Sequence, residues 1–344
     1  MSKITKDITL EEWEKLYTAA VDFRDIECWN WMFDTDLFGV QDPETKEIGY
    51  CSVLGNLGEF FSLNVYLGEE GLKSYLKMLT QEEASFDSEI LYVQDCLVAS
   101  FVNKEVLHKK DLEVIERLEL KFQGENQWPI FRRYKPGFYP WFLTKEEVRF
   151  LTIMLEQAKN VALLFKKNET LFTPPQKGLL FVMTPEKKGK KIKWEEKWIR
   201  PEFKPEVIKI PIIDDYSIKE AKESINSKEG EWEIDFFYAP FTIQEKEEEV
   251  PYYPLVCLFI DHLSGLIIDF QLSKSREYLK EFLNKFLDII EFKRITPLRI
   301  LVKKKECYLL FKQIAKELEI ELMVIESLKE LEEAKKELFR RRLF

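Results

Sequence analysis

The chain has 344 residues, which is enough for two domains of ordinary size. Hydrophobic residues make up 45% of the sequence and aromatic residues 14%, so the composition excludes a disordered chain. A formal net charge of −10 argues against a protein that coats nucleic acid over its whole surface, but it leaves a local basic face open. The 33% charged fraction, dominated by Lys and Glu, is typical both of heat-adapted (thermophilic) proteins and of AT-rich genomes.

The cysteines and histidines limit the chemistry further. Five cysteines are scattered through apolar stretches without a C-x-x-C pair, which predicts buried free thiols in a reducing cytoplasm. A zinc site or a histidine-dependent catalytic site would have to use His108 or His262. The first fifteen residues lack the layout of a signal peptide, and the apolar runs are too short to span a bilayer. We therefore expect a soluble cytoplasmic protein without a membrane partner.

The first 170 residues predict an α+β domain. Thr9 with Glu12, and later Thr144 with Glu147, have the capping-box spacing that begins a helix. Between them, "YCSVLGNLGEFFSLNVYLG" (50–68) predicts a β-hairpin around its glycine turn. Further expected elements are a helix over 69–84, a strand or strand pair over 88–102 and a short helix within 108–122.

An aromatic segment, "QWPIFRRYKPGFYPWFL" (127–143), contains three prolines and predicts an irregular, well-packed piece of chain. Its arginines and rings could form a pocket for an anion or a peptide, with guanidinium groups presented over aromatic faces. The candidate ligand-binding residues are Arg132, Arg133, Tyr139 and Trp141. The alternative, which the prolines favour, is a stiff lid packed on the core of the first domain.

Residues 171–228 predict a connecting hairpin followed by an extended linker. The hairpin combines lysines with tryptophans, a composition seen in proteins that bind single-stranded nucleic acid. The candidate contacts are Lys190, Lys191, Lys193, Trp194 and Trp198. Neighbouring glutamates dilute the positive charge, so the alternative is a lysine-rich turn that only keeps the hairpin tip in solvent.

Residues 229–344 predict three strands, then a helix, a strand, a helix, a strand and a helix. This order resembles the ribonuclease H-like fold of integrases and transposases, with a mixed α/β sheet. The resemblance places "WEIDF" where those enzymes carry their first catalytic aspartate, which here is Asp235. "FIDHLSGLIIDF" resembles their second and third strands, and "TPLRILVKKKE" falls at the end of the fourth.

An active nuclease of this fold would need carboxylates around two Mg²⁺ or Mn²⁺ ions roughly 3.5–4 Å apart. Asp235 would then be joined by Asp261, Glu306 or Glu326 as possible co-ligands. However, three lysines (303–305) follow the fourth strand, and an ammonium group there would repel the metal. The sequence therefore favours a degenerate scaffold that needs no cofactor and keeps one aspartate.

Several stretches along the chain resemble a bacterial family that pairs two domains of unknown function in this order. They are "GYCSVLGNLGE", "VYLGEEGL", "WPIFRRYKPGFYPWFLT" and "WEIDFFYAPF". The resemblance implies a bacterial origin and a two-domain build, and it supplies no catalytic residues. We expect a non-catalytic binding or interaction protein whose partner is a protein or a nucleic acid. The alternative is a divalent-metal-dependent nuclease or phosphodiesterase that uses Asp235.

Overall fold

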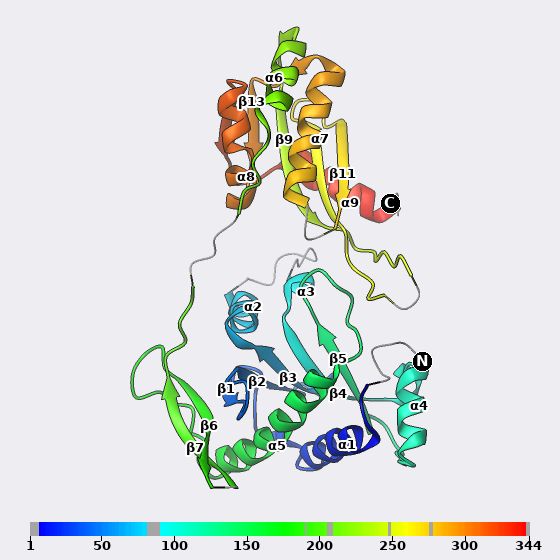
Figure 1. Ribbon diagram of the computed structural model, residues 1–344, viewed down its shortest axis with the longest axis vertical. Helices are drawn as coiled ribbons and strands as arrows, with labels where there is room; N and C mark the ends of the chain where they lie inside the picture. Colours follow the sequence, from blue (N-terminus) through cyan, green and yellow to red (C-terminus); the bar gives the residue numbers. More distant parts are fainter. Residues whose placement is uncertain are drawn as a thin grey trace. The chain divides into compact units, whose positions relative to one another are not determined.

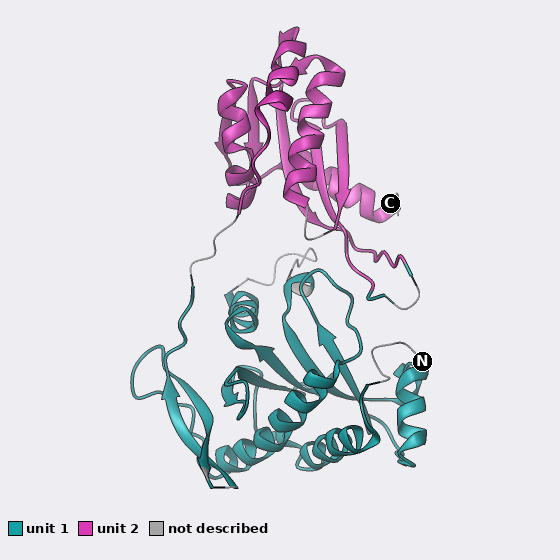
Figure 2. Cartoon of the chain, in the orientation of Figure 1, with its two compact units in different colours: residues 1–204, 246–250 teal, residues 205–245, 251–344 magenta. Residues whose placement is uncertain are grey.

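The computed structural model describes residues 7–80, 90–189, 191–204, 209–246, 249–274 and 278–341. The chain divides into two compact units (Figure 2). Unit 1 comprises residues 1–204 and 246–250, and unit 2 comprises residues 205–245 and 251–344. The boundary at 204/205 lies inside the segment that the sequence predicted as a connection (171–228). All five cysteines are buried and free, as predicted.

Unit 1 is built on a seven-stranded sheet with the order β5-β4-β3-β2-β1-β6-β7 (Figure 1). Its strands are β1 (Phe38–Gln41), β2 (Ile48–Leu54), β3 (Phe61–Leu67), β4 (Cys96–Val102), β5 (Trp128–Tyr134), β6 (Leu180–Lys188) and β7 (Lys191–Ile199). Neighbouring strands are antiparallel except for β1 and β6, which are parallel and align Gly39 with Val182. A Cβ atom on Gly39 would lie 2.9 Å from a methyl group of Val182, so glycine permits this close approach.

Helices cover both faces of this sheet. The helical elements are α1 (Leu10–Arg24), η2 (Cys28–Asn30), α2 (Gly68–Thr80), α3 (Ile90–Val93), η3 (Lys104–Val106), α4 (Lys109–Arg117) and α5 (Lys145–Lys167). Side chains of α1 and α5 share the larger core with one face of the sheet, and α2 packs against the other face. The two capping boxes predicted from the sequence, Thr9 with Glu12 and Thr144 with Glu147, are both formed.

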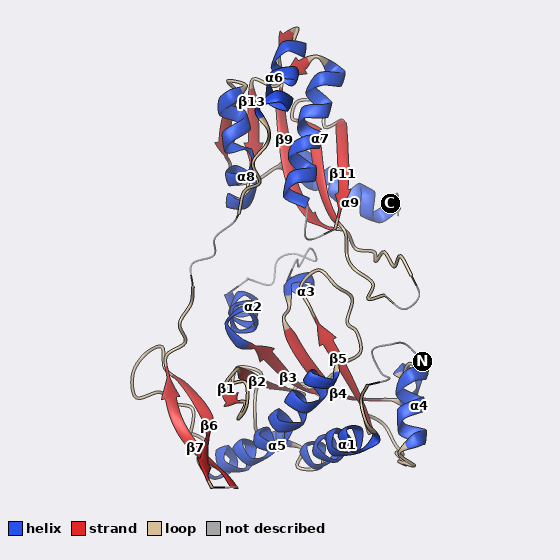
Figure 3. Ribbon diagram, in the orientation of Figure 1, coloured by secondary structure: helices blue, strands red, loops and turns tan. Residues whose placement is uncertain are grey.

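Unit 2 contains a mixed five-stranded sheet with the order β11-β10-β9-β13-β14 (Figure 3). Its strands are β9 (Glu231–Tyr238), β10 (Leu255–Asp261), β11 (Ile267–Ser273), β13 (Arg299–Val302) and β14 (Glu321–Val324). β10 runs antiparallel to β9 and β11, whereas β13 is parallel to β9 and β14 is parallel to β13. A separate two-stranded sheet joins β8 (Ser227–Lys228) to β12 (Ile295–Thr296).

The helices of unit 2 divide between the two faces of its main sheet. They are α6 (Asp215–Ser224), α7 (Tyr278–Lys293), α8 (Lys305–Glu317) and α9 (Lys329–Arg341). α6, α7 and α8 share a core with one face, and α9 covers the other. From β9 to α9 the main elements follow the order expected from the sequence, three strands and then alternating helices and strands. The unit is therefore a mixed α/β domain.

Two expectations for unit 1 were wrong in part. The aromatic segment is not irregular throughout, because residues 128–134 form the regular strand β5 at the border of the sheet. Pro129 is compatible with β5 because an edge strand pairs on one side only and does not need every backbone N–H group. For residues 88–102 a strand or a strand pair was expected; Cys96–Val102 form the strand β4, but the short helix α3 precedes it, and residues 88 and 89 lie outside the described part of the chain.

Candidate functional site

Asp235 lies on the central strand β9, beside the place where β13 ends and the chain turns into α8. Its side chain is largely buried, with 13% of its surface exposed. One carboxylate oxygen, Oδ2, lies 3.4 Å from Nζ of Lys304, the N-cap residue of α8. The other, Oδ1, accepts a hydrogen bond from the thiol of Cys307 at 3.4 Å. Asp235 therefore contacts the first turn of α8 through a cation and a thiol.

Lys304 is held in this position by more than the ion pair. Its ammonium group donates a hydrogen bond of 2.6 Å to the backbone carbonyl of Phe236 and lies over the ring of that residue, 5.6 Å from the centroid. A contact to a backbone carbonyl, a ring face and a carboxylate fixes the end of a side chain that would otherwise be flexible. Contacts within unit 2 therefore hold the positive charge of Lys304 beside Asp235.

The two cysteines nearest this ion pair are protonated thiols. Burial raises the pKa of Cys307 well above its usual range, and the negative charge of Asp235 adds to that shift. Burial and the same aspartate also raise the pKa of Cys257. A thiol with a raised pKa is a poor nucleophile and a poor metal ligand at neutral pH. Cys307 acts here as a hydrogen-bond donor.

The structure does not bring the four candidate carboxylates together. Asp261 pairs across the sheet with Trp232, three residues before Asp235 on β9, which separates the two aspartates by about 10 Å along the strand. Glu306 is exposed in the first turn of α8, and Glu326 is exposed between β14 and α9. In the part of the chain that the structure describes, no group of three or more His, Cys, Asp or Glu side chains could hold a metal ion.

Asp261 has a local role at the turn between β10 and β11. Its Oδ1 accepts hydrogen bonds from the hydroxyl and the backbone N–H of Ser264, at 2.6 and 2.8 Å. The hydroxyl contact is the main reason that the pKa of Asp261 lies below its usual value, although partial burial opposes it. These contacts account for an aspartate at the start of a tight turn.

Glu233 is a polar group that the sequence did not single out. It is completely buried on β9, where its Oε1 lies 2.6 Å from Nδ1 of His262 and its Oε2 accepts the backbone N–H of Leu331 at 2.8 Å. Leu331 is in the first turn of α9, so the carboxylate also lies at the favourable end of the helix dipole. The alternation of side chains along β9 predicts that Glu233 lies on the solvent-exposed face of the sheet. The signal that this face is covered is the amphipathic pattern of the last helix, α9.

The two arginines of the aromatic segment do not share a pocket. They are adjacent on β5, and successive side chains of a strand point to opposite faces. Arg132 forms a two-pronged ion pair with Asp111 of α4, with distances of 2.8 and 2.6 Å, and lies 4.7 Å from the centroid of the Phe142 ring. Both charged side chains are mostly buried, with 15% and 8% of their surfaces exposed.

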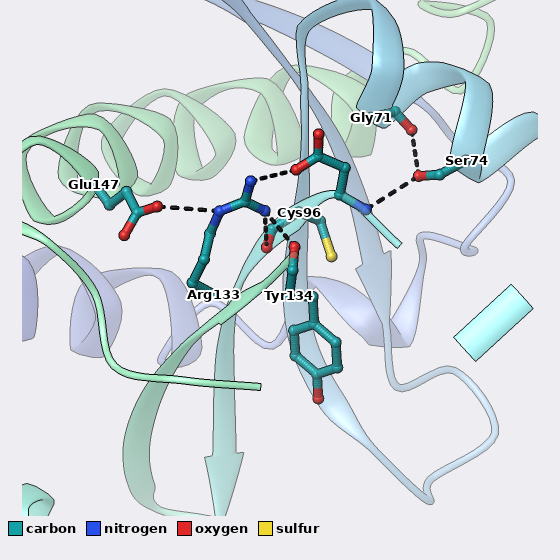
Figure 4. A network of polar contacts seen from close by, with 7 residues as sticks. Gly71, Ser74, Cys96, Arg133, Tyr134 and Glu147 are labelled. Atoms are coloured by element: carbon teal, nitrogen blue, oxygen red, sulfur yellow. Dashed lines mark hydrogen bonds and ion pairs between the residues drawn. The ribbon is translucent and has the colours of Figure 1, made fainter. Parts of the chain in front are cut away.

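Arg133 is the centre of a separate polar network (Figure 4). Its guanidinium group pairs with Asp95 and with Glu147 of α5, and it donates to the backbone carbonyls of Cys96 and Tyr134. The backbone N–H of Asp95 in turn donates to the hydroxyl of Ser74, which donates to the carbonyl of Gly71. The network joins β4 and β5 to helices α2 and α5, so these partners account for the arginine.

The remaining residues of the segment follow the same pattern. Trp141 forms an isolated bridge with the backbone of Arg133, and its buried indole Nε1 has no hydrogen-bond partner among the residues that the structure describes. Tyr139 is 47% exposed. The proline-rich part of the segment therefore folds back on β5.

Strand alternation also separates the lysines of the β6–β7 hairpin from its tryptophans. Trp194 and Trp198 are even-numbered and pack against the core of unit 1, whereas Lys191 and Lys193 are odd-numbered and exposed. A surface that stacks bases and binds phosphates needs rings and cations on one face. Lys193 also pairs with Glu195 at 3.5 Å. Lys190 lies outside the described residues.

The comparisons with known proteins follow the division into two units. Residues 13–183 match a family described as "Domain of unknown function (DUF7309)". Residues 217–339 match a second family, "Domain of unknown function (DUF6930)". Two families of unknown function thus match the two parts of the chain, which agrees with the expectation of two domains of unknown function. No curated protein matches the chain.

Among the solved structures that are similar to part of the chain is an integrase core. It is described as the HTLV-2 integrase catalytic core domain in complex with magnesium (trimeric form), with 18% sequence identity and a TM-score of 0.26. The match covers 35% of this chain and 74% of the integrase chain. A TM-score at this level carries no argument about fold or function. Separately, none of the helices in the described ranges is long and apolar enough to cross a membrane.

Proposed function

We propose that this protein is a non-catalytic binding protein of the bacterial cytoplasm, whose unit 2 is a degenerate ribonuclease H-like scaffold. Its partner is a protein or a nucleic acid. The order of elements from β9 to α9 and the mixed sheet that they form support the scaffold assignment. A fold alone carries no activity, so the functional part of the proposal depends on the groups around Asp235.

The observation that carries the proposal is the ammonium group of Lys304 beside Asp235. At 3.4 Å the two charges neutralise each other, and a pair near 4 Å attracts by about 4 kcal/mol at an effective dielectric constant of 20. A divalent cation bound to Asp235 would have to displace this ammonium group or accept its repulsion. Metal-dependent cleavage needs further carboxylates at the metal. Of the candidate co-ligands, Asp261 lies about 10 Å from Asp235 along the strand, and Glu306 and Glu326 are exposed.

A cleavage assay tests this proposal directly. Labelled single-stranded and double-stranded DNA and RNA are incubated with the full chain over a titration of Mg²⁺ and of Mn²⁺. We expect no metal-dependent cleavage, and the same result for Asp235→Asn. Cleavage by the wild type that disappears in Asp235→Asn would overturn the proposal in favour of a nuclease or phosphodiesterase.

A matched variant separates the role of Asp235 from a general loss of charge. Asp269 on β11 also forms an ion pair, 2.6 Å from Nζ of Lys285, so Asp269→Asn removes a comparable charge elsewhere in the same sheet. Contaminating nuclease would persist equally in both variants. Fluorescence anisotropy with the same oligonucleotides tests the partner class, because binding without cleavage would identify nucleic acid.

A further inference from the structure

A groove in unit 1 collects three large apolar side chains that are exposed. They are Leu57 (88% exposed), Phe60 (74%) and Phe33 (53%). Together with Leu54 they line a hollow of about 270 Å³. Single exposed apolar residues are normal on protein surfaces, but several that gather in one hollow mark an interaction site.

The groove has a defined shape because the β2–β3 loop is tied to the segment around Trp29. The side-chain amide of Asn56 donates to the backbone carbonyl of Trp29 at 3.1 Å, and the N–H of Gly58 donates to the carbonyl of Gly55 at 2.9 Å. Gly55 has a φ of +138°, and a Cβ atom there would lie 2.7 Å from the Phe61 ring. Only glycine fits this position, so the loop is held in the conformation that presents Leu57 and Phe60 to solvent.

These exposed side chains are not required by the core beneath them. Trp29 and Phe61 form a ring contact with centroids 4.9 Å apart, and they close the core under the loop. Leu57 and Phe60 lie outside that contact. Burying such side chains against another molecule would remove apolar surface from water at roughly 25 cal/mol per Å². Leu57 and Phe60 therefore expose apolar surface that a binding partner could bury.

Size and charge indicate what fits the groove. A volume of about 270 Å³ lies just below the roughly 300–1,000 Å³ of small-molecule sites, which suits one or two anchoring side chains. Of the described residues that line it, the charged ones are Asp34 and Glu59, and both are exposed. Their negative charge favours a cation at the edge of the groove and disfavours the phosphates of a nucleic acid.

We propose that this groove docks a short segment of a partner protein that inserts a large apolar side chain next to a lysine or arginine. This inference rests on the proposed binding function and chooses the protein partner over the nucleic acid. Leu57, Phe60 and Phe33 bind the apolar anchor, and Asp34 and Glu59 pair with the neighbouring cation. The groove belongs to unit 1, so it is independent of the ion pair at Asp235.

The test is a selection of random twelve-residue peptides displayed on phage against the full chain. The double variant Leu57→Ser/Phe60→Ser serves for counter-selection. We expect enriched peptides to share a leucine, isoleucine, phenylalanine or tryptophan beside a lysine or arginine. Synthetic copies should bind the double variant at least tenfold more weakly in fluorescence anisotropy, because most of the buried apolar area is lost. The charge-reversed variant Asp34→Lys/Glu59→Lys should also bind severalfold more weakly at low salt.

A matched control is Leu263→Ser in the β10–β11 turn, which removes an apolar side chain that is 95% exposed and should leave peptide binding unchanged. Selected peptides without basic residues, or no preference for the wild type over either variant, would overturn the inference. So would self-association of the wild type that Leu57→Ser/Phe60→Ser abolishes in light scattering, because the occupant would then be a second copy. Such failures leave the proposed function intact unless Asp235-dependent cleavage is also observed.

Discussion

Asp235 and Lys304 show how one side chain can determine the chemistry that a strand end supports. The ammonium group provides the positive charge that a buried carboxylate needs, and it does so without a metal. It is anchored to the Phe236 carbonyl as well, so it cannot move away from the carboxylate without losing a hydrogen bond. We therefore expect the residue at position 304 to decide whether Asp235 can bind a metal ion.

Reversing that charge should create a cation site. In Lys304→Glu two carboxylates would face each other at the end of β13, and we expect the variant to lose about 3–5 kcal/mol of unfolding free energy from repulsion and the lost ion pair. Added Mn²⁺ should raise the melting temperature of the variant but not that of the wild type. The control is Lys303→Glu, which changes an exposed neighbour paired with Glu332. An equal response to Mn²⁺ in all three proteins would contradict the prediction.

Asp42 should make unit 1 sensitive to acid. Burial works to raise its pKa, but hydrogen bonds from the backbone N–H groups of Thr45 and Glu44 and the nearby Arg149 outweigh it, and the pKa is lowered. A lowered carboxyl pKa stabilises the fold above the pKa of the unfolded chain, near 3.9, and this contribution is lost as pH falls through the lower folded value.

The prediction is checked by urea unfolding of wild type and Asp42→Asn. At pH 7 we expect the variant to be less stable by about 1–3 kcal/mol, since the buried ion pair with Arg149 is broken. Near pH 3 the difference should shrink, because the carboxyl of Asp42 is then largely protonated in the unfolded chain, whose pKa is near 3.9, while its folded pKa is lower. Asp22→Asn, which removes an exposed partner of Lys159, should show little difference at either pH. A gap that stays constant with pH would contradict this account.

At the scale of elements, α9 is attached to unit 2 by both apolar and polar contacts. Leu328 and Leu331 pack on the sheet, and Glu233 accepts the Leu331 N–H while it holds His262. A carboxylate buried under a helix would be unfavourable without these two partners. The glutamate thus links β9, the β10–β11 turn and α9.

Removing this link should loosen α9. In Glu233→Ala the Leu331 N–H and the His262 ring lose their partner and a small cavity remains, so we expect a loss of about 3 kcal/mol. Amide hydrogen exchange should increase first in residues 329–341, because that helix covers its face of the sheet. Glu231→Ala removes a neighbouring glutamate that pairs with Arg299 nearer the surface, and it should have a smaller effect. Unchanged exchange in α9 would argue against the link.

The sequence predicted the elements whose signals are local. Capping boxes located the starts of α1 and α5, and the order of elements in unit 2 followed from alternating apolar patterns and turns. The sequence also placed a lysine directly after β13, because the position of that strand follows from the order of the elements. These signals depend on residues only a few positions apart.

The features that the sequence missed depend on residues far apart in the chain. Strand β5 is stabilised by pairing with β4, and this pairing overrides the irregularity that three prolines suggest. The parallel pairing of β1 with β6 joins segments about 140 residues apart and has no local signature. The burial of Glu233 depends on α9, which begins almost 100 residues later. All three features are determined by tertiary contacts, which the local sequence does not show.

At the scale of the whole molecule, each unit has its own buried core. The clusters around α5 and around α2 belong to unit 1, and those around α7 and α9 belong to unit 2. No residue of one cluster belongs to the other unit in the part of the chain that the structure describes. Separate cores are the usual basis of independent folding.

We therefore expect residues 1–204 and residues 205–344 to fold when produced separately, each with a cooperative transition in calorimetry. A piece that ends at residue 179 is the informative control, since it lacks β6 and β7 and should be much less stable. Phe181 and Met183 of β6 are part of the core, so this shorter piece would expose apolar surface. If residues 1–204 failed to fold while 1–179 folded, the unit boundary would be wrong.

The parallel pairing of β1 with β6 also has a consequence for synthesis on the ribosome. Strand β1 ends at Gln41, but its parallel partner β6 ends at Lys188 and cannot pair with it until those residues have left the exit tunnel. During this interval β1 has an unpaired edge in the nascent chain, next to the core residue Val40. Long-range pairings of this kind form late and slowly. We therefore expect the first half of the protein to be most prone to aggregation before the β6–β7 hairpin is made.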